Sequence, residues 1–119
     1  MTQEHHQYVV PIGTHLIVDI KEADNLNNLA FIQSLLDQCV AACDAHIIHQ
    51  HLHHFGANHG ITGMYLLSES HMSIHTWPEH KFAAIDIFLC GDHNPYYAVD
   101  VIKESFKNAK ITVKEYFRH

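Results

Sequence analysis

The most reactive side chains of this sequence lie in one stretch, residues 68–79, which reads SESHMSIHTWPE. It holds three serines, two histidines and two glutamates, and apolar segments flank it on both sides. Polar groups taken out of water need hydrogen-bond partners, so this stretch is a costly choice for structure alone. The pattern therefore predicts a functional site, although it does not specify the reaction by itself.

The three cysteines are further candidates for chemistry. An odd number cannot pair completely within one chain, so a disulfide framework is not expected. Cys39 and Cys43 are four residues apart on one apolar helical face, where two thiols could ligate a metal. Buried, small hydrophobic side chains are nevertheless the favoured interpretation of this pair.

The chain also contains 14 histidines, several of them in the run HQHLHH at residues 49–54. On a strand, His49, His51 and His53 would share one face, and three imidazoles suit zinc or nickel. Further candidate ligands are His46, His59 and His71. A solvated strand face is the favoured interpretation of the run, since His-rich tracts are compositional evidence only. No HExxH or CxxC spacing accompanies the run, so no specific metal site is predicted.

Short strands must position these residues. Alternating or continuous apolar character predicts strands at residues 13–20, 46–53, 61–67, 71–76, 82–90 and 110–117. The segment 82–90 is the most apolar and is expected to be central. A helix is predicted after Asn25 as its N-cap, and a second helix after the Asn94-Pro95 pair. Gly56, Asn58 and Gly60 mark a turn over residues 55–60.

The order of these elements predicts the fold class. Strands outnumber helices, and several strands follow one another with no helix between them. This order favours an α+β fold, a two-layer α/β sandwich in which a mostly antiparallel sheet carries two helices on one face. No linker-like or low-complexity segment other than the histidines interrupts the pattern, so residues 1–119 are expected to form a single domain.

Composition excludes several classes of protein. The 119 residues carry 7 Lys and Arg against 13 Asp and Glu, a net charge of −6 that argues against a nucleic-acid partner. No apolar run approaches the ~20 residues of a membrane span, and the N-terminus lacks the pattern of a secretion signal. A cytoplasmic protein is therefore expected. The absence of a GxSxG elbow and of a phosphate-binding glycine loop excludes two large enzyme groups.

The polar stretch and the residues around it resemble the signature of the prokaryotic S-adenosylmethionine decarboxylase proenzymes, the small pyruvoyl-dependent type. The matching segments are ESH at 69–71, IHTWPE at 74–79, AAID at 83–86 and CG at 90–91. Weaker similarity begins with GTHLI at residue 13 and includes Asp19, Phe55 and GITG at 60–63, so that it spans nearly the whole chain. The fold implied by the resemblance, an α/β sandwich with an antiparallel sheet, agrees with the predicted elements.

The resemblance implies that the chain cuts itself between Glu69 and Ser70, giving a β chain of residues 1–69 and an α chain of residues 70–119. The Ser70 hydroxyl attacks the Glu69 carbonyl and converts the amide to an ester. Loss of the Ser70 α-proton then eliminates the Glu69 carboxylate, and the dehydroalanine hydrolyses to a pyruvoyl group. This ketone forms a Schiff base with the substrate amine and accepts the electrons left by CO2.

Roles for five other residues are implied by the same resemblance. His75 assists removal of the Ser70 α-proton, and Thr62 stands where many relatives have a serine that supports processing. Cys90 protonates the substrate carbon after decarboxylation. The remaining two bind substrate. Glu79 accepts hydrogen bonds from the ribose, and Phe55 stacks on the adenine near the sulfonium.

The implied activity is decarboxylation of S-adenosyl-L-methionine to its decarboxylated form and CO2, and the product is the aminopropyl donor for spermidine biosynthesis. The implied assembly is a homodimer of cleaved αβ protomers. Two alternatives stay open at this point. One is an arginine or ornithine decarboxylase with the same pyruvoyl chemistry, and the other is a His-rich metal-binding protein that does not process itself.

Overall fold

Six strands form one antiparallel sheet in residues 11–119, the part of the chain that this computed structural model describes. Their order across the sheet is β2-β3-β4-β5-β1-β6, and each neighbouring pair is antiparallel. The strands are β1 (Gly13–Lys21), β2 (Ile47–His54), β3 (Ile61–Leu67), β4 (Ser70–Trp77), β5 (Phe82–Cys90) and β6 (Lys110–Arg118). The N-terminal segment, for which no secretion signal is predicted, lies outside the described residues.

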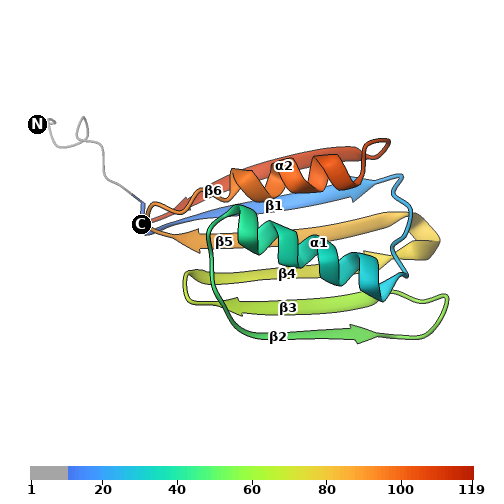
Figure 1. Ribbon diagram of the computed structural model, residues 1–119. Helices are drawn as coiled ribbons and strands as arrows, with labels where there is room; N and C mark the ends of the chain where they lie inside the picture. Colours follow the sequence, from blue (N-terminus) through green and yellow to red (C-terminus); the bar gives the residue numbers. More distant parts are fainter. Residues whose placement is uncertain (1–10) are drawn as a thin grey trace, which may run out of the picture.

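Two helices in this part of the chain, α1 (Leu29–Ala42) and α2 (Tyr96–Ser105), cover the same face of the sheet, as Figure 1 shows. The predicted two-layer α+β sandwich is therefore confirmed. The predicted start of α1 is wrong, because the side chain of Asn28, not Asn25, accepts the capping hydrogen bond from the Phe31 amide at 3.0 Å. Asn25 has a φ of 64° and lies in the turn before the helix, where its carbonyl accepts from the Asn28 amide.

The core lies between the helices and the sheet. Alternate residues of the inner strands are fully buried on this side, including Leu16 and Val18 on β1 and Ile85 and Ile87 on β5. Burial of such a side chain stabilises the fold by about 1.5–3 kcal/mol relative to exposure. Strand β5 lies between β4 and β1, so the central position predicted for residues 82–90 is confirmed.

The cysteine pair of α1 belongs to this core. Cys39 and Cys43 are both buried, and the Cys39 thiol faces the Ala98 carbonyl of α2. Burial raises the pKa of Cys39 to about 12 and raises that of Cys43 as well. A thiol that resists ionisation is a poor nucleophile and a poor metal ligand, so the structural interpretation of this pair is confirmed.

The opposite face of the sheet carries neither helix. We call it the helix-free face. Four large apolar side chains on it are at least 39% exposed, namely Met64, Leu66, Trp77 and Tyr116.

Among the described residues, neither helix has the length and apolar character needed to cross a membrane.

Candidate active site

The seven residues singled out from the sequence fall into two groups at opposite ends of the sheet. The hairpin end, where β3 turns into β4 at the left of Figure 1, holds Glu69, Ser70 and Cys90. The far end, where β4 finishes and residues 55–60 join β2 to β3, holds Phe55, Thr62, His75 and Glu79.

Ser70 and His75 are the pair that this arrangement separates. Both belong to β4, five residues apart. A strand advances by ~3.3 Å per residue, so their Cα atoms are about 16 Å apart. One chain therefore does not bring the His75 ring to the Ser70 α-proton.

At the hairpin end, the Glu69–Ser70 peptide is held in an unusual conformation. Ser70 has a φ of 134°, in a region that favours glycine and costs other residues roughly 1–3 kcal/mol. The Cys90 amide donates a hydrogen bond of 2.8 Å to the Glu69 carbonyl oxygen, and the Ser70 Oγ lies 3.3 Å from His71 Nδ1. A backbone N–H aimed at a carbonyl can stabilise the negative charge that develops there when a nucleophile adds.

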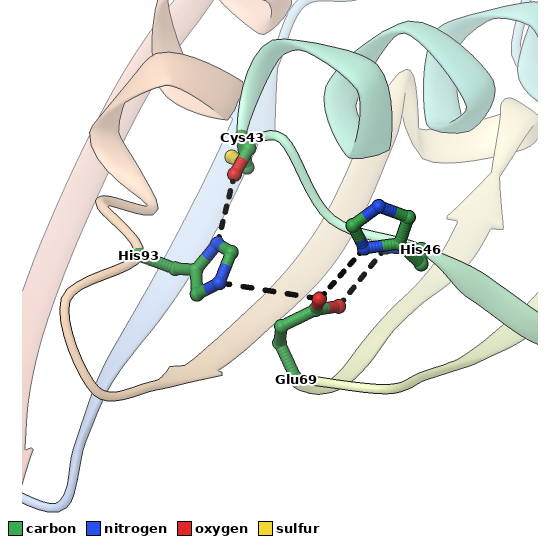
Figure 2. Close-up of polar contacts among 4 residues, drawn as sticks. All are labelled: Cys43, His46, Glu69 and His93. Carbon is green, nitrogen blue, oxygen red and sulfur yellow. Dashed lines mark hydrogen bonds and ion pairs between the residues drawn. The ribbon is translucent and has the colours of Figure 1, made fainter.

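The Glu69 side chain points inward, in contrast to an ordinary hairpin glutamate. The residue is 9% exposed, and its Oε1 accepts a hydrogen bond of 2.9 Å from the His46 amide. Its Oε2 lies 2.9 Å from His46 Nδ1 and 3.9 Å from His93 Nε2, while His93 donates from Nδ1 to the Cys43 carbonyl at 3.1 Å (Figure 2).

The contacts of Glu69 shift two pKa values in opposite directions. The hydrogen bond from the His46 side chain, followed by that from the His46 amide, lowers the pKa of Glu69. The same carboxylate raises the pKa of His46, and Asp44 adds to this effect. Both shifts favour a carboxylate–imidazolium pair.

An aromatic and cationic cluster lies beside Ser70 on the helix-free face. His15 and His71 pack against Phe88 with ring centroids 5.6 and 5.8 Å apart, and the Arg118 guanidinium lies 5.9 Å from the Phe88 ring centre. The His15 Nε2 is buried without a hydrogen bond and lies 3.7 Å from an Asp86 oxygen. The strand register places both His15 and His71 opposite Phe88. Alternation along these adjacent strands is the sequence signal from which the cluster could have been predicted.

The far end is more open. Thr62 and His75 face each other across β3 and β4, with 3.1 Å between Oγ1 and Nδ1. Glu79 is exposed in the short 3₁₀ helix η2 (Pro78–His80) that follows β4. Phe55 is 60% exposed and packs edge-on against His53, with ring centroids 4.5 Å apart.

An open pocket of about 560 Å³ lies at the far end, and two of its lining residues are close neighbours of Glu79 in the sequence. It is lined by Lys21, Glu22, Trp77, His80 and Phe82. The Trp77 and Phe82 rings are 5.5 Å apart. The lining thus combines two aromatic rings with the charged side chains of Lys21 and Glu22.

The histidine run lies on β2 at the edge of the sheet. His49, His51 and His53 are all exposed, as the solvated-face interpretation predicts. Across residues 11–119, no three His, Cys, Asp or Glu side chains come together in a way that could hold a metal ion.

Comparison with known proteins identifies the family. The S-adenosylmethionine decarboxylase family matches residues 14–119. Proteins named S-adenosylmethionine decarboxylase proenzyme from Methanococcus aeolicus and Thermomicrobium roseum are 41% and 36% identical, over 86% and 90% of this chain and 89% and 93% of theirs. The crystal structure of the adenosylmethionine decarboxylase from Aquifex aeolicus VF5 is 34% identical, with a TM-score of 0.84 and 92% of each chain covered. This chain therefore belongs to the S-adenosylmethionine decarboxylase family.

Proposed function

We propose that this protein is a self-processing, pyruvoyl-dependent decarboxylase of S-adenosyl-L-methionine, whose product serves spermidine biosynthesis. One observation carries the proposal. The Cys90 amide donates a hydrogen bond of 2.8 Å to the Glu69 carbonyl oxygen, and the residue after Glu69 is Ser70, with a φ of 134°. The hydrogen bond continues the β4–β5 register, whereas the positive φ of Ser70 is unusual for a serine. Together they place a backbone N–H on the carbonyl that the Ser70 hydroxyl would attack.

Self-cleavage would begin with Ser70 Oγ adding to the Glu69 carbonyl carbon. Negative charge then develops on the carbonyl oxygen that faces the Cys90 amide. Collapse breaks the C–N bond, and the hydroxyl proton passes to the released nitrogen, with His71 Nδ1 within 3.3 Å of Oγ to carry it. The resulting ester no longer requires the Ser70 conformation, so the backbone strain favours the product.

Elimination and hydrolysis complete the processing. Removal of the Ser70 α-proton breaks the Cβ–Oγ bond and releases the Glu69 carboxylate, and water then replaces the nitrogen as ammonia. We propose that the chain is thus divided into residues 1–69 and 70–119. The pyruvoyl group left at residue 70 supplies an electron sink for decarboxylation. Cys90, exposed at the end of β5 and next to the strand partner of Ser70, is the proposed proton donor to the substrate carbon.

We propose a homodimer as the active assembly, because each chain holds the two halves of the site at opposite ends of one face. A two-fold axis through the helix-free face would lay the far end of each subunit over the hairpin end of the other. The partner subunit's His75 and Thr62 would then reach Ser70. The exposed apolar side chains of this face, Met64 and Trp77 among them, support its burial in an interface.

The far end is the proposed adenosine site. A carboxylate such as Glu79 can accept hydrogen bonds from two ribose hydroxyls, and Phe55 offers an exposed ring to the adenine and the sulfonium. Arginine and ornithine need neither contact, so these alternatives have no support at the far end. The metal-binding alternative lacks a three-ligand group in the described residues.

The intact mass of purified protein under denaturing and reducing conditions tests the proposal. We expect two species that divide between Glu69 and Ser70, the C-terminal one lighter by one ammonia than a fragment that begins with serine. CO2 release from S-adenosylmethionine, arginine and ornithine should then be compared, and only the first should react. A single full-length species, or an unmodified serine at the new terminus, would contradict the proposal.

A further inference from the structure

The Glu69 side chain is held by residues that the processing chemistry above does not use. His46 lies in the connection between α1 and β2, and His93 lies in the connection between β5 and α2. Both converge on one carboxylate in the β3–β4 hairpin (Figure 2). We call Glu69, His46 and His93 the Glu69 clamp.

Each Glu69 oxygen has a partner in the clamp. Oε1 accepts from the His46 amide at 2.9 Å, and Oε2 accepts from His46 Nδ1 at 2.9 Å with His93 Nε2 at 3.9 Å. His93 is itself fixed, because its Nδ1 donates to the carbonyl of the buried Cys43. A buried carboxylate without such partners would be strongly unfavourable, so the clamp determines where the Glu69 side chain lies.

The same residue is fixed through its backbone. The Glu69 carbonyl accepts from the Cys90 amide at 2.8 Å, and the Ser68 amide donates to the His46 carbonyl at 2.9 Å. Residue 69 is thus fixed by its side chain on one side and by its carbonyl on the other. Ser70 follows it with the positive φ. A free Glu69 side chain would allow the hairpin to relax and take the carbonyl away from the Cys90 amide.

We propose that the Glu69 clamp positions the Glu69–Ser70 peptide for self-cleavage and makes the rate of cleavage depend on pH. The inference rests on the proposed function and adds positioning residues to it. His46 and His93 touch neither the attacking oxygen nor the scissile carbonyl in the structure. They act through the side chain of Glu69.

The sign of the pH dependence follows from the groups that face the clamp. His46 faces Glu69 and has Asp44 nearby, and Glu69 faces His46 and His93. The His46 pKa is raised, so the charged contact is complete below the ordinary histidine pKa of about 6.5 and is lost as the pH rises through the raised value. The advantage of wild type over a His46 variant should therefore be large near pH 6 and should decline as the pH rises through the raised His46 pKa.

The test follows conversion of the newly synthesised full-length chain into its two fragments from pH 5.5 to pH 8.5, after cell-free synthesis and by mass spectrometry. Glu69→Ala should slow cleavage about tenfold or more, because it removes both charged hydrogen bonds. His46→Ala should slow it about threefold to tenfold near pH 6 and by less as the pH rises, because the neutral ring keeps only an uncharged hydrogen bond to Glu69. His46→Asn keeps a donor at the position of Nδ1 and cannot titrate, so it should restore part of the rate without the pH dependence.

Two controls separate positioning from folding. Glu104→Gln removes an exposed glutamate that pairs with Lys107 on the surface, and it should leave the cleavage rate unchanged. The clamp substitutions should also be made together with Ser70→Ala, so that thermal unfolding can be measured on uncut protein. Slowed cleavage in chains that remain folded at the assay temperature supports the clamp.

Each failure has its own reading. If wild type is cut, and both Glu69→Ala and His46→Ala are cut at the wild-type rate at every pH, the proposed role of the clamp is wrong and the proposed function stands. If the His46 variants are slowed equally at all pH values, the clamp does not act through charge and the inference is overturned. If wild type is never cut, the proposed function fails and the clamp fails with it.

Discussion

The hairpin end and the far end of the sheet differ in how completely one chain assembles them. At the hairpin end, Glu69 is buried and each of its carboxylate oxygens has a hydrogen-bond partner. Its backbone carbonyl accepts a hydrogen bond from the Cys90 amide. At the far end, His75 and Phe55 are exposed. The difference indicates that the Glu69–Ser70 bond, which we propose is cut, is held by its own chain, whereas the groups at the far end have surface left for another molecule.

The largest expected effect comes from removing the nucleophile at the hairpin end. Ser70→Ala lacks the hydroxyl that attacks Glu69, so cleavage should stop completely, and intact mass should show the full-length chain alone. Ser34→Ala on α1, which loses only a surface bond to Gln38, is the matched control and should be cut normally. Continued cleavage of Ser70→Ala between residues 69 and 70 would remove the basis of the mechanism.

A second substitution at the same end should separate two functions of one residue. Cys90→Ala keeps the amide that faces Glu69 but loses the thiol. Cleavage should therefore proceed within about twofold of wild type, whereas kcat for CO2 release should fall by about 100-fold, as expected for loss of a general acid. Both quantities should be measured on one preparation. An uncut Cys90→Ala chain would mean that the thiol, and not the amide, serves processing.

At the far end, the expected effects are on binding. Glu79→Gln weakens acceptance of two hydroxyl hydrogen bonds, so KM for S-adenosylmethionine should rise about tenfold with little change in kcat. Glu104→Gln, which changes a carboxylate that is also exposed but lies on α2, should leave KM unchanged. A fall in kcat at constant KM would mean that Glu79 acts in the catalytic step and not in binding, which would contradict the proposed difference between the two ends.

Much of the fold could be predicted from the sequence, because local patterns determine it. Strands β3 and β5 were predicted to the residue, since runs of apolar residues between more polar flanking segments mark both ends. The start of α1 was not, because Asn25 and Asn28 are both good caps. The choice between them depends on the turn that gives Asn25 a positive φ.

Candidate residues for the site could be named from the sequence, but their arrangement could not. The family resemblance assigns roles to Ser70 and His75 without stating that β4 separates them by five residues. The clamp was missed for a different reason. His46 and His93 stand more than 20 residues from Glu69 in the chain on either side, and only the two connections that follow α1 and β5 bring them to one carboxylate.

The smallest expected effect is on stability and again contrasts the two ends. In the uncut Ser70→Ala protein, Glu69 with its lowered pKa adds stability above its ordinary pKa and loses it as the pH falls through the lower, folded value. His46 has a raised pKa, so its contribution to stability is lost as the pH rises through the raised value. The Tm advantage over the Glu69→Gln, Ser70→Ala double variant should therefore be greatest between about pH 5 and pH 6.5. An advantage that is constant from pH 4 to pH 8 would contradict this ion pair.

The most direct test of the account is complementation between two inactive chains. Ser70→Ala lacks the proposed nucleophile and His75→Ala lacks the proposed far-end base, so neither should be cut alone. When the two are synthesised together, a mixed dimer joins the intact hairpin end of the His75→Ala chain to the intact far end of the other. Intact mass should then show cleavage of the His75→Ala chain alone, while the Ser70→Ala chain stays whole. If the His75→Ala chain stays uncut in the mixture, or is cut when alone, the two ends do not form a shared site.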